Sequence, residues 1–78
     1  MTARPVKRSL TLRGHRTSVS LEEEFWVAFR QIAAQRGIAL NALAAEIDAA
    51  RGTSSGLASA IRVFVLKELQ AQTGAADP

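Results

Sequence analysis

One short stretch of alternating residues, followed at once by helical periodicity, constrains the fold of this chain more than any other feature. Over residues 15–21, residues suited to a core alternate with polar ones, which is the two-residue period of a strand with one buried face. A weaker alternation begins at Ser9, and Gly14 interrupts it. The pattern allows two short strands around a turn, or one strand preceded by a flexible arm.

Three segments with helical periodicity follow the strand. The first begins at residues 20–23, a capping box in which the Ser20 hydroxyl is the N-cap, and it ends before Gly37. The second helix is expected over residues 40–50 and the third over residues 57–71. The sequence therefore predicts a mainly α fold with a short β-strand.

A lone strand leaves its backbone groups and its apolar face without partners. The sequence indicates no partner for residues 15–21 in the same chain, and a domain of 78 residues seldom buries enough surface alone. Pairing with the same strand of a second copy solves both problems, so we expect a homodimer with an intersubunit antiparallel β-ribbon. The residues that we expect in the dimer core are Val19, Leu21, Phe25, Trp26, Phe29, Ile47, Ile61 and Phe64.

Charge is distributed unevenly along the chain. The net charge is +3, but all seven acids and five of the ten bases lie after residue 20, so the first 20 residues carry +5 and the rest −2. A basic segment before a polar strand indicates a polyanionic partner, either nucleic acid or an anionic membrane surface. The alternatives are a solvated tail and an organelle transit peptide, although the segment lacks the helical periodicity of the latter.

The composition argues against several other functions. The chain has no cysteine and no tyrosine, and a single histidine, which leaves little for acid–base chemistry or metal binding. It also contains no nucleophile–base pair and no glycine-rich phosphate loop. We therefore expect no enzyme activity, no cofactor and no metal. No apolar run approaches the length of a membrane span, so we expect a cytoplasmic domain without a membrane partner.

The order of strand, helix, glycine stop and helix resembles the ribbon-helix-helix family of DNA-binding proteins, the Arc and MetJ type. In that family two strands form an antiparallel ribbon that enters the major groove. Residues 14–22, Phe25-Trp26 and residues 40–43 are similar to a branch of short bacterial ribbon-helix-helix proteins, which also has a segment like residues 57–66. The resemblance covers about residues 7–70 and implies a ribbon-helix-helix domain with an additional C-terminal helix.

The resemblance also implies which residues contact DNA. The positions that contact bases fall on Arg16, Ser18 and Ser20, although Ser20 cannot fully serve as N-cap and base contact at once. The family holds a phosphate with amides at the start of its second helix, and a small hydroxyl residue usually caps that helix, whereas Ala39 stands here. The residues expected to contact phosphates are Arg8, Arg13, His15, Leu40, Asn41 and Ala42.

These observations divide the chain into a flexible basic arm (1–8), the domain (9–72) and a disordered tail (73–78). The predicted function is a sequence-specific transcriptional regulator of double-stranded DNA, repressor or antitoxin-like. The alternative is a homodimeric interaction module that binds a partner protein through the C-terminal helix, with the arm only solubilising the chain. The basic arm lies directly before the polar strand face, and this favours DNA binding.

Overall fold

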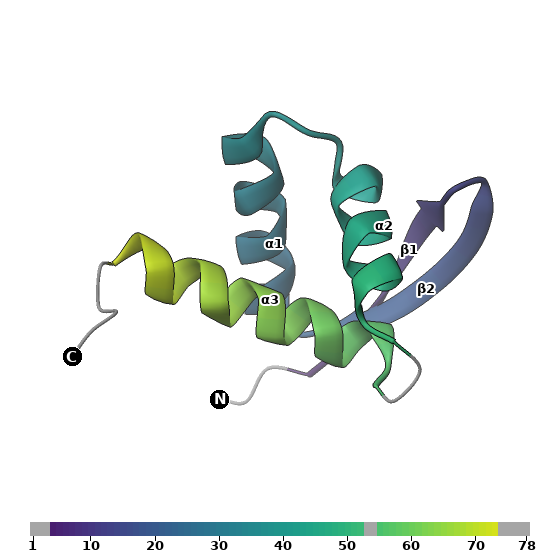
Figure 1. Ribbon diagram of the computed structural model, residues 1–78. Coiled ribbons are helices and arrows are strands. Elements are labelled where there is room, and N and C mark those ends of the chain that lie inside the picture. Colours follow the sequence, from purple (N-terminus) through teal and green to yellow (C-terminus); the bar gives the residue numbers. More distant parts are fainter. Residues whose placement is uncertain (1–3, 53–54, 74–78) are drawn as a thin grey trace.

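The computed structural model describes residues 4–52 and 55–73, which form a two-stranded sheet and helices (Figure 1). The elements in chain order are β1 (Val6–Leu12), β2 (His15–Leu21), α1 (Glu23–Arg36), α2 (Leu40–Ala50) and α3 (Leu57–Gln72). The mainly α fold with a third helix is therefore confirmed. The tail expected at 73–78 lies, apart from Thr73, outside the described residues. No helix in the described ranges is long and apolar enough to cross a membrane.

The two strands form a hairpin within one chain, which corrects our expectation of a lone strand. β1 pairs antiparallel with β2, from Val6 opposite Leu21 to Leu12 opposite His15. A two-residue turn joins them, in which Arg13 (φ 54°) and Gly14 (φ 81°) both have positive φ. That is the signature of a type I′ turn, whose twist matches the twist of a hairpin. Of the two possibilities left open by the sequence, two strands around a turn is the observed one.

Two local expectations also change. β1 begins at Val6, so residues 6–8, which we assigned to the flexible arm, are strand. Helix α1 begins slightly later than predicted, with Glu22 as N-cap and no side-chain cap hydrogen bond within the described chain. Ser20 is not the cap, because it lies in β2 opposite Lys7 and the strand ladder continues past it to Leu21. Because Ser20 is paired in the sheet and is not the N-cap, its two proposed roles, as N-cap and as base contact, no longer compete.

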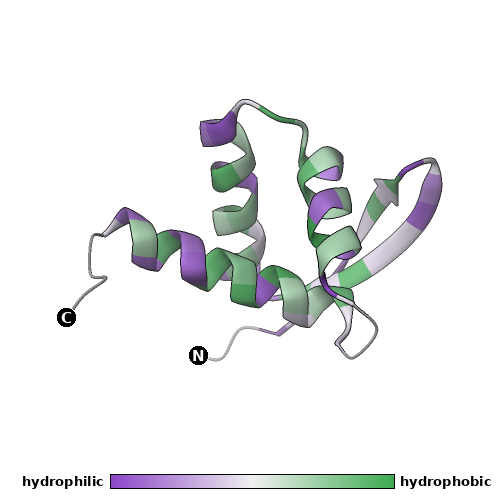
Figure 2. Cartoon of the chain, viewed as in Figure 1, coloured by the Kyte–Doolittle hydropathy of each residue, from purple (hydrophilic) through white to green (hydrophobic). Residues whose placement is uncertain are grey.

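The inner face of the hairpin packs on the helices and closes a small core. Figure 2 shows hydrophobic segments, in green, on the strands and on the helices that contribute to it. Leu10 and Leu12 from β1 and Val19 and Leu21 from β2 are buried there. Of the residues expected in a dimer core, Val19, Leu21, Phe29, Ile47 and Ile61 are buried within one chain. Phe25, Trp26 and Phe64 are half-buried and pack against them. One chain therefore already uses most of the apolar surface that we had assigned to the contact between two.

At the edge of this core, arginine side chains connect α1 to β1 and to α3. Arg36 pairs with Glu68 of α3 at 2.6 Å and stacks over Phe64 at 5.1 Å from the ring centre. Arg8 of β1 pairs with Glu23 and stacks over Trp26 at 5.1 Å. Each such exposed ion pair contributes about 0–1 kcal/mol to the free energy of unfolding. Their main effect is therefore to fix the orientation of the hairpin and of α3 relative to α1.

Candidate nucleic-acid interface

The outer face of the hairpin is polar along its whole length. Residues directly opposite each other in an antiparallel pair project to the same face, and every second residue of each strand belongs to it. This outer face consists of Lys7 opposite Ser20, Ser9 opposite Ser18, and Thr11 opposite Arg16, all exposed. It therefore combines two cations with four hydroxyl groups and no acid.

The predicted base-contacting residues all come from one edge of this face. Arg16, Ser18 and Ser20 project from β2 to the same side, as the alternation predicted. Sequence reasoning missed the β1 half, which is Lys7, Ser9 and Thr11. Their alternation with Arg8, Leu10 and Leu12 indicates a strand with one buried face, but the charge of Arg8 at an inner position obscured this pattern.

The N-terminus of α2 lies at the edge of β1. The backbone amide of Thr11 donates to Oδ1 of Asn41 at 3.1 Å, which ties the second residue of α2 to the strand. The N-cap Ala39 makes no side-chain cap hydrogen bond to the described residues, and the first turn of α2 has no acid. The amides of Leu40, Asn41 and Ala42 precede the first helical bond, from Leu43 N to Ala39 O at 3.0 Å. Free amides and the helix dipole make such a terminus suitable for an anion.

The predicted phosphate contacts are only partly brought together. Asn41 and its helix terminus adjoin the outer face, and Arg13 is exposed at the turn. His15 is exposed at the same end of the hairpin, and together with Arg13 it lines a hollow of about 360 Å³ beside Asp48 and Arg51. Arg8 lies elsewhere, on the inner side opposite Val19, where it is half-buried and paired with Glu23. Its Nε atom is buried without a partner among the described residues.

Helix α3 holds the other strand. Arg62 donates from one terminal nitrogen to the carbonyl oxygen of Ser20 at 3.2 Å, and from Nε to Oε1 of Glu22 at 3.0 Å. The pKa of Glu22 is lowered, because a backbone hydrogen bond and the bond from Arg62 both favour the charged carboxylate. The hairpin is therefore held at both edges, by Asn41 from α2 and by Arg62 from α3. Within residues 4–52 and 55–73, no cluster of acids and histidine is arranged to hold a metal ion.

A polar two-stranded ribbon, followed by two helices of which the second begins at the ribbon's edge, defines the ribbon-helix-helix class of fold. The family model described as the ribbon-helix-helix domain matches residues 5–69, and the chain belongs to this family. The match extends into α3, so the third helix is part of the domain in this family. Members are typically non-enzymatic, DNA-binding regulators and generally bind DNA as dimers. Comparison with curated proteins and with solved structures gave no match.

Proposed function

We propose that this protein is a sequence-specific DNA-binding regulator whose hairpin enters the major groove with its outer face toward the bases. The observation that carries the proposal is the hydrogen bond between Thr11 and Asn41. It places an uncapped helix N-terminus beside a polar, cationic ribbon. A base-reading surface and a phosphate-binding surface therefore adjoin each other, as binding across one strand of a duplex requires.

The ribbon has the size and the chemistry for direct reading of bases. The major groove admits a two-stranded ribbon, and one hairpin of this chain supplies both strands. Arg16 carries a planar fork of donors that matches the two acceptors of a guanine edge. Ser18 and Ser20 have short hydroxyl groups that can donate or accept, so they adapt to several bases and discriminate weakly. We therefore assign most of the base specificity to Arg16, with Lys7 of β1 as a second contributor.

Phosphate contacts are assigned to the surface beside the ribbon. The first amides of α2 would hold one phosphate, and Arg13 and His15 at the turn would approach the backbone further along the groove. Such contacts position the protein without reading sequence, and they make the affinity depend on salt. Arg8 is not included, because its guanidinium already pairs with Glu23 on the inner side of the hairpin.

The regulatory role that fits best is that of a repressor or an antitoxin-like regulator, working as a homodimer. A small domain with one reading face acts most simply by occupying an operator. The exposed apolar side chains of α3, which are Val63, Leu66 and Leu69, leave room for a protein contact beside the DNA contact.

The test is recovery of genomic DNA fragments on the purified protein at two salt concentrations. We expect a small set of fragments with a shared sequence to survive the higher salt, while bulk DNA is released. Recovery of random fragments at low salt and of none at higher salt would contradict sequence-specific binding. Failure to recover DNA at either salt would overturn the proposal.

A further inference from the structure

The outer face of the hairpin consists of three closely opposed residue pairs. In an antiparallel ladder, pairs that exchange backbone hydrogen bonds alternate with pairs whose backbone groups point outward, and in the outward kind the Cα atoms are only about 4.5 Å apart. The amide of Thr11 points outward to Asn41, and the carbonyl group of Ser20 points outward to Arg62. Because successive outer-face pairs are two residues apart along the ladder, all three belong to the outward kind. Their side chains therefore rise close together from a backbone that is narrower than a major groove of about 12 Å.

The two cations of this face lie at diagonally opposite corners. Lys7 is near the start of β1, whereas Arg16 lies on β2 at the turn end of the hairpin, opposite Thr11. Lys7 is four positions before Thr11, which is about 14 Å at about 3.4 Å per residue. One base-pair step rises about 3.4 Å along the axis of a duplex, and the path along the groove is longer because the groove winds around the axis. The two corners therefore lie about three to four base-pair steps apart.

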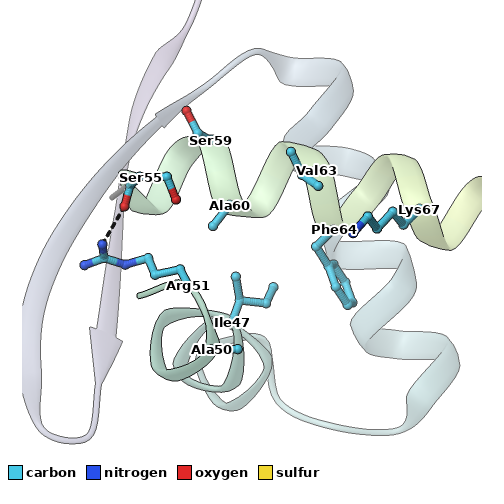
Figure 3. A pocket seen from close by; sticks show the side chains of 9 residues that line it. All are labelled: Ile47, Ala50, Arg51, Ser55, Ser59, Ala60, Val63, Phe64 and Lys67. Atoms are coloured by element: carbon cyan, nitrogen blue, oxygen red, sulfur yellow. Dashed lines mark hydrogen bonds between the residues drawn. The ribbon is translucent and has the colours of Figure 1, made fainter. Parts of the chain in front are cut away.

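Both cations have donors available to a ligand. Lys7 and Arg16 are exposed, and within residues 4–52 and 55–73 neither takes part in an ion pair. Arginines near the helices differ in this respect. Arg51, for example, pairs with Asp48 at 2.7 Å and donates to the carbonyl oxygen of Ser55 at 2.6 Å, a bond that Figure 3 shows as a dashed line.

The other positions of the outer face carry only hydroxyl groups. Ser9 and Ser18 lie opposite each other at the centre, and Thr11 and Ser20 complete the two end pairs. A hydroxyl group both donates and accepts hydrogen bonds, so it adapts to the edges of several bases. The donor groups that favour one particular base are therefore confined to the two corners.

We propose that Lys7 and Arg16 bind two guanines on opposite DNA strands, three to four base-pair steps apart, with weak selection of the bases between them. This inference rests on the proposed function and adds the base pattern that the hairpin selects. Arginine and lysine both donate to O6 and N7 of guanine, the two acceptors at its major-groove edge. Because the two cations belong to different β-strands, which lie side by side across the groove, each is nearer to a different strand of the duplex.

The test is selection of bound duplexes from a library with a randomised core, using the full chain. For the parent we expect both guanines to be enriched, each preferred over other bases on the order of tenfold, and more strongly at the Arg16 position because its fork is planar. Glutamine binds the edge of adenine instead. Lys7→Gln and Arg16→Gln should therefore each change one of the two positions from guanine to adenine, in every repeat of the pattern, and leave the other unchanged. Arg30→Gln, which removes the same charge from the exposed surface of α1, should change neither.

A change of preferred base distinguishes base contact from charge, because loss of a phosphate contact weakens binding to all sequences alike. The proposal is overturned if Lys7→Gln weakens binding without changing a preferred base. It is also overturned if the two variants alter the same position, or positions outside the stated spacing. Lys7→Arg is used if far-UV circular dichroism shows that Lys7→Gln does not fold. It should strengthen the guanine preference at the Lys7 position, and an unchanged preference there would count against the proposal.

The same selection separates this inference from the function on which it rests. Enrichment of a shared sequence with a different arrangement of guanines would contradict the inference alone. Enrichment of no sequence by the parent would overturn sequence-specific binding, and this inference with it.

Discussion

The side-chain oxygen of Asn41 accepts a hydrogen bond from the backbone amide of Thr11 at 3.1 Å, across 29 intervening residues of the chain. The contact joins a strand that carries polar side chains to a helix terminus that carries free amides. Asn41 thus has two functions that can be separated: it is an acceptor for β1, and it belongs to the turn that would approach a phosphate.

Asn41→Asp separates these two functions. Aspartate keeps the acceptor for Thr11 and is favourable in the first turn of a helix, so the free energy of unfolding should stay within a few tenths of a kcal/mol of the parent value. The added negative charge lies where we place a phosphate, so affinity for all DNA sequences should fall together. Asn41→Ala is the control: it removes the hydrogen bond at a cost of about 1 kcal/mol without adding charge. Unchanged DNA affinity of Asn41→Asp would remove the start of α2 from the interface.

Arg13→Asn is expected to stabilise the fold while weakening DNA binding. Arg13 has a φ of 54°, a conformation that costs most L-residues roughly 1 kcal/mol and that asparagine tolerates better. Asn-Gly is also the preferred pair for a type I′ turn. Chemical denaturation should show a gain of a few tenths of a kcal/mol to about 1 kcal/mol. If Arg13 binds a phosphate, its removal makes the slope of log affinity against log salt shallower by about 0.9 for each phosphate released. A shallower slope without a gain in stability would contradict the account of the turn.

The pH dependence of stability should reflect Glu22. Its folded-state pKa is lowered from the ordinary value of 4.5 by a backbone hydrogen bond and by Arg62. The charged carboxylate therefore contributes fully to the stability of the fold above pH 4.5, and this contribution is lost as the pH falls through the folded-state pKa. Glu22→Gln should therefore lose less stability than the parent when the pH falls below about 4.5. Thermal unfolding followed by circular dichroism across that range measures the difference. Glu24→Gln removes a neighbouring carboxylate and keeps the bond between Glu22 and Arg62, so it is the matched control and should keep the loss of stability that comes from Glu22.

Structural features that depend on residues close together in the chain could be predicted from the sequence. Features that depend on contacts between residues far apart in the chain could not. Local patterns were sufficient for the helices, because the periodicity of residues 40–50 and the glycine stop at Gly37 lie within a few residues of what they determine. The sequence left the first strand open and missed its start at residues 6–8, because Arg8 occupies an inner position, where its guanidinium pairs with Glu23 and stacks over Trp26. No local pattern reveals those partners.

The candidate site could likewise be predicted only where it depends on local patterns. Alternation within one strand was enough to place Arg16, Ser18 and Ser20 on one face. The partners that hold the ribbon could not be foreseen, because Arg62 and Ser20 are 42 positions apart and meet only after α3 packs on the core. The Ser20 cap was wrong for a related reason: a local capping motif and a longer strand ladder competed for the same residue, and the ladder prevailed.

Arg16→Lys separates base reading from charge. Arg16 projects from β2 on the outer face of the hairpin, opposite Thr11, and is exposed. Lysine keeps the positive charge but lacks the planar fork that binds both acceptors of a guanine edge. On the cognate site, the variant should lose on the order of 1–3 kcal/mol for each base contact, while its binding to random DNA stays near the parent value. Arg30→Lys, the same change on the exposed surface of α1, should leave both affinities unaltered. Fluorescence anisotropy with cognate and random duplexes measures both affinities for the parent and for each variant, and equal losses of Arg16→Lys on the two duplexes would make Arg16 a phosphate contact.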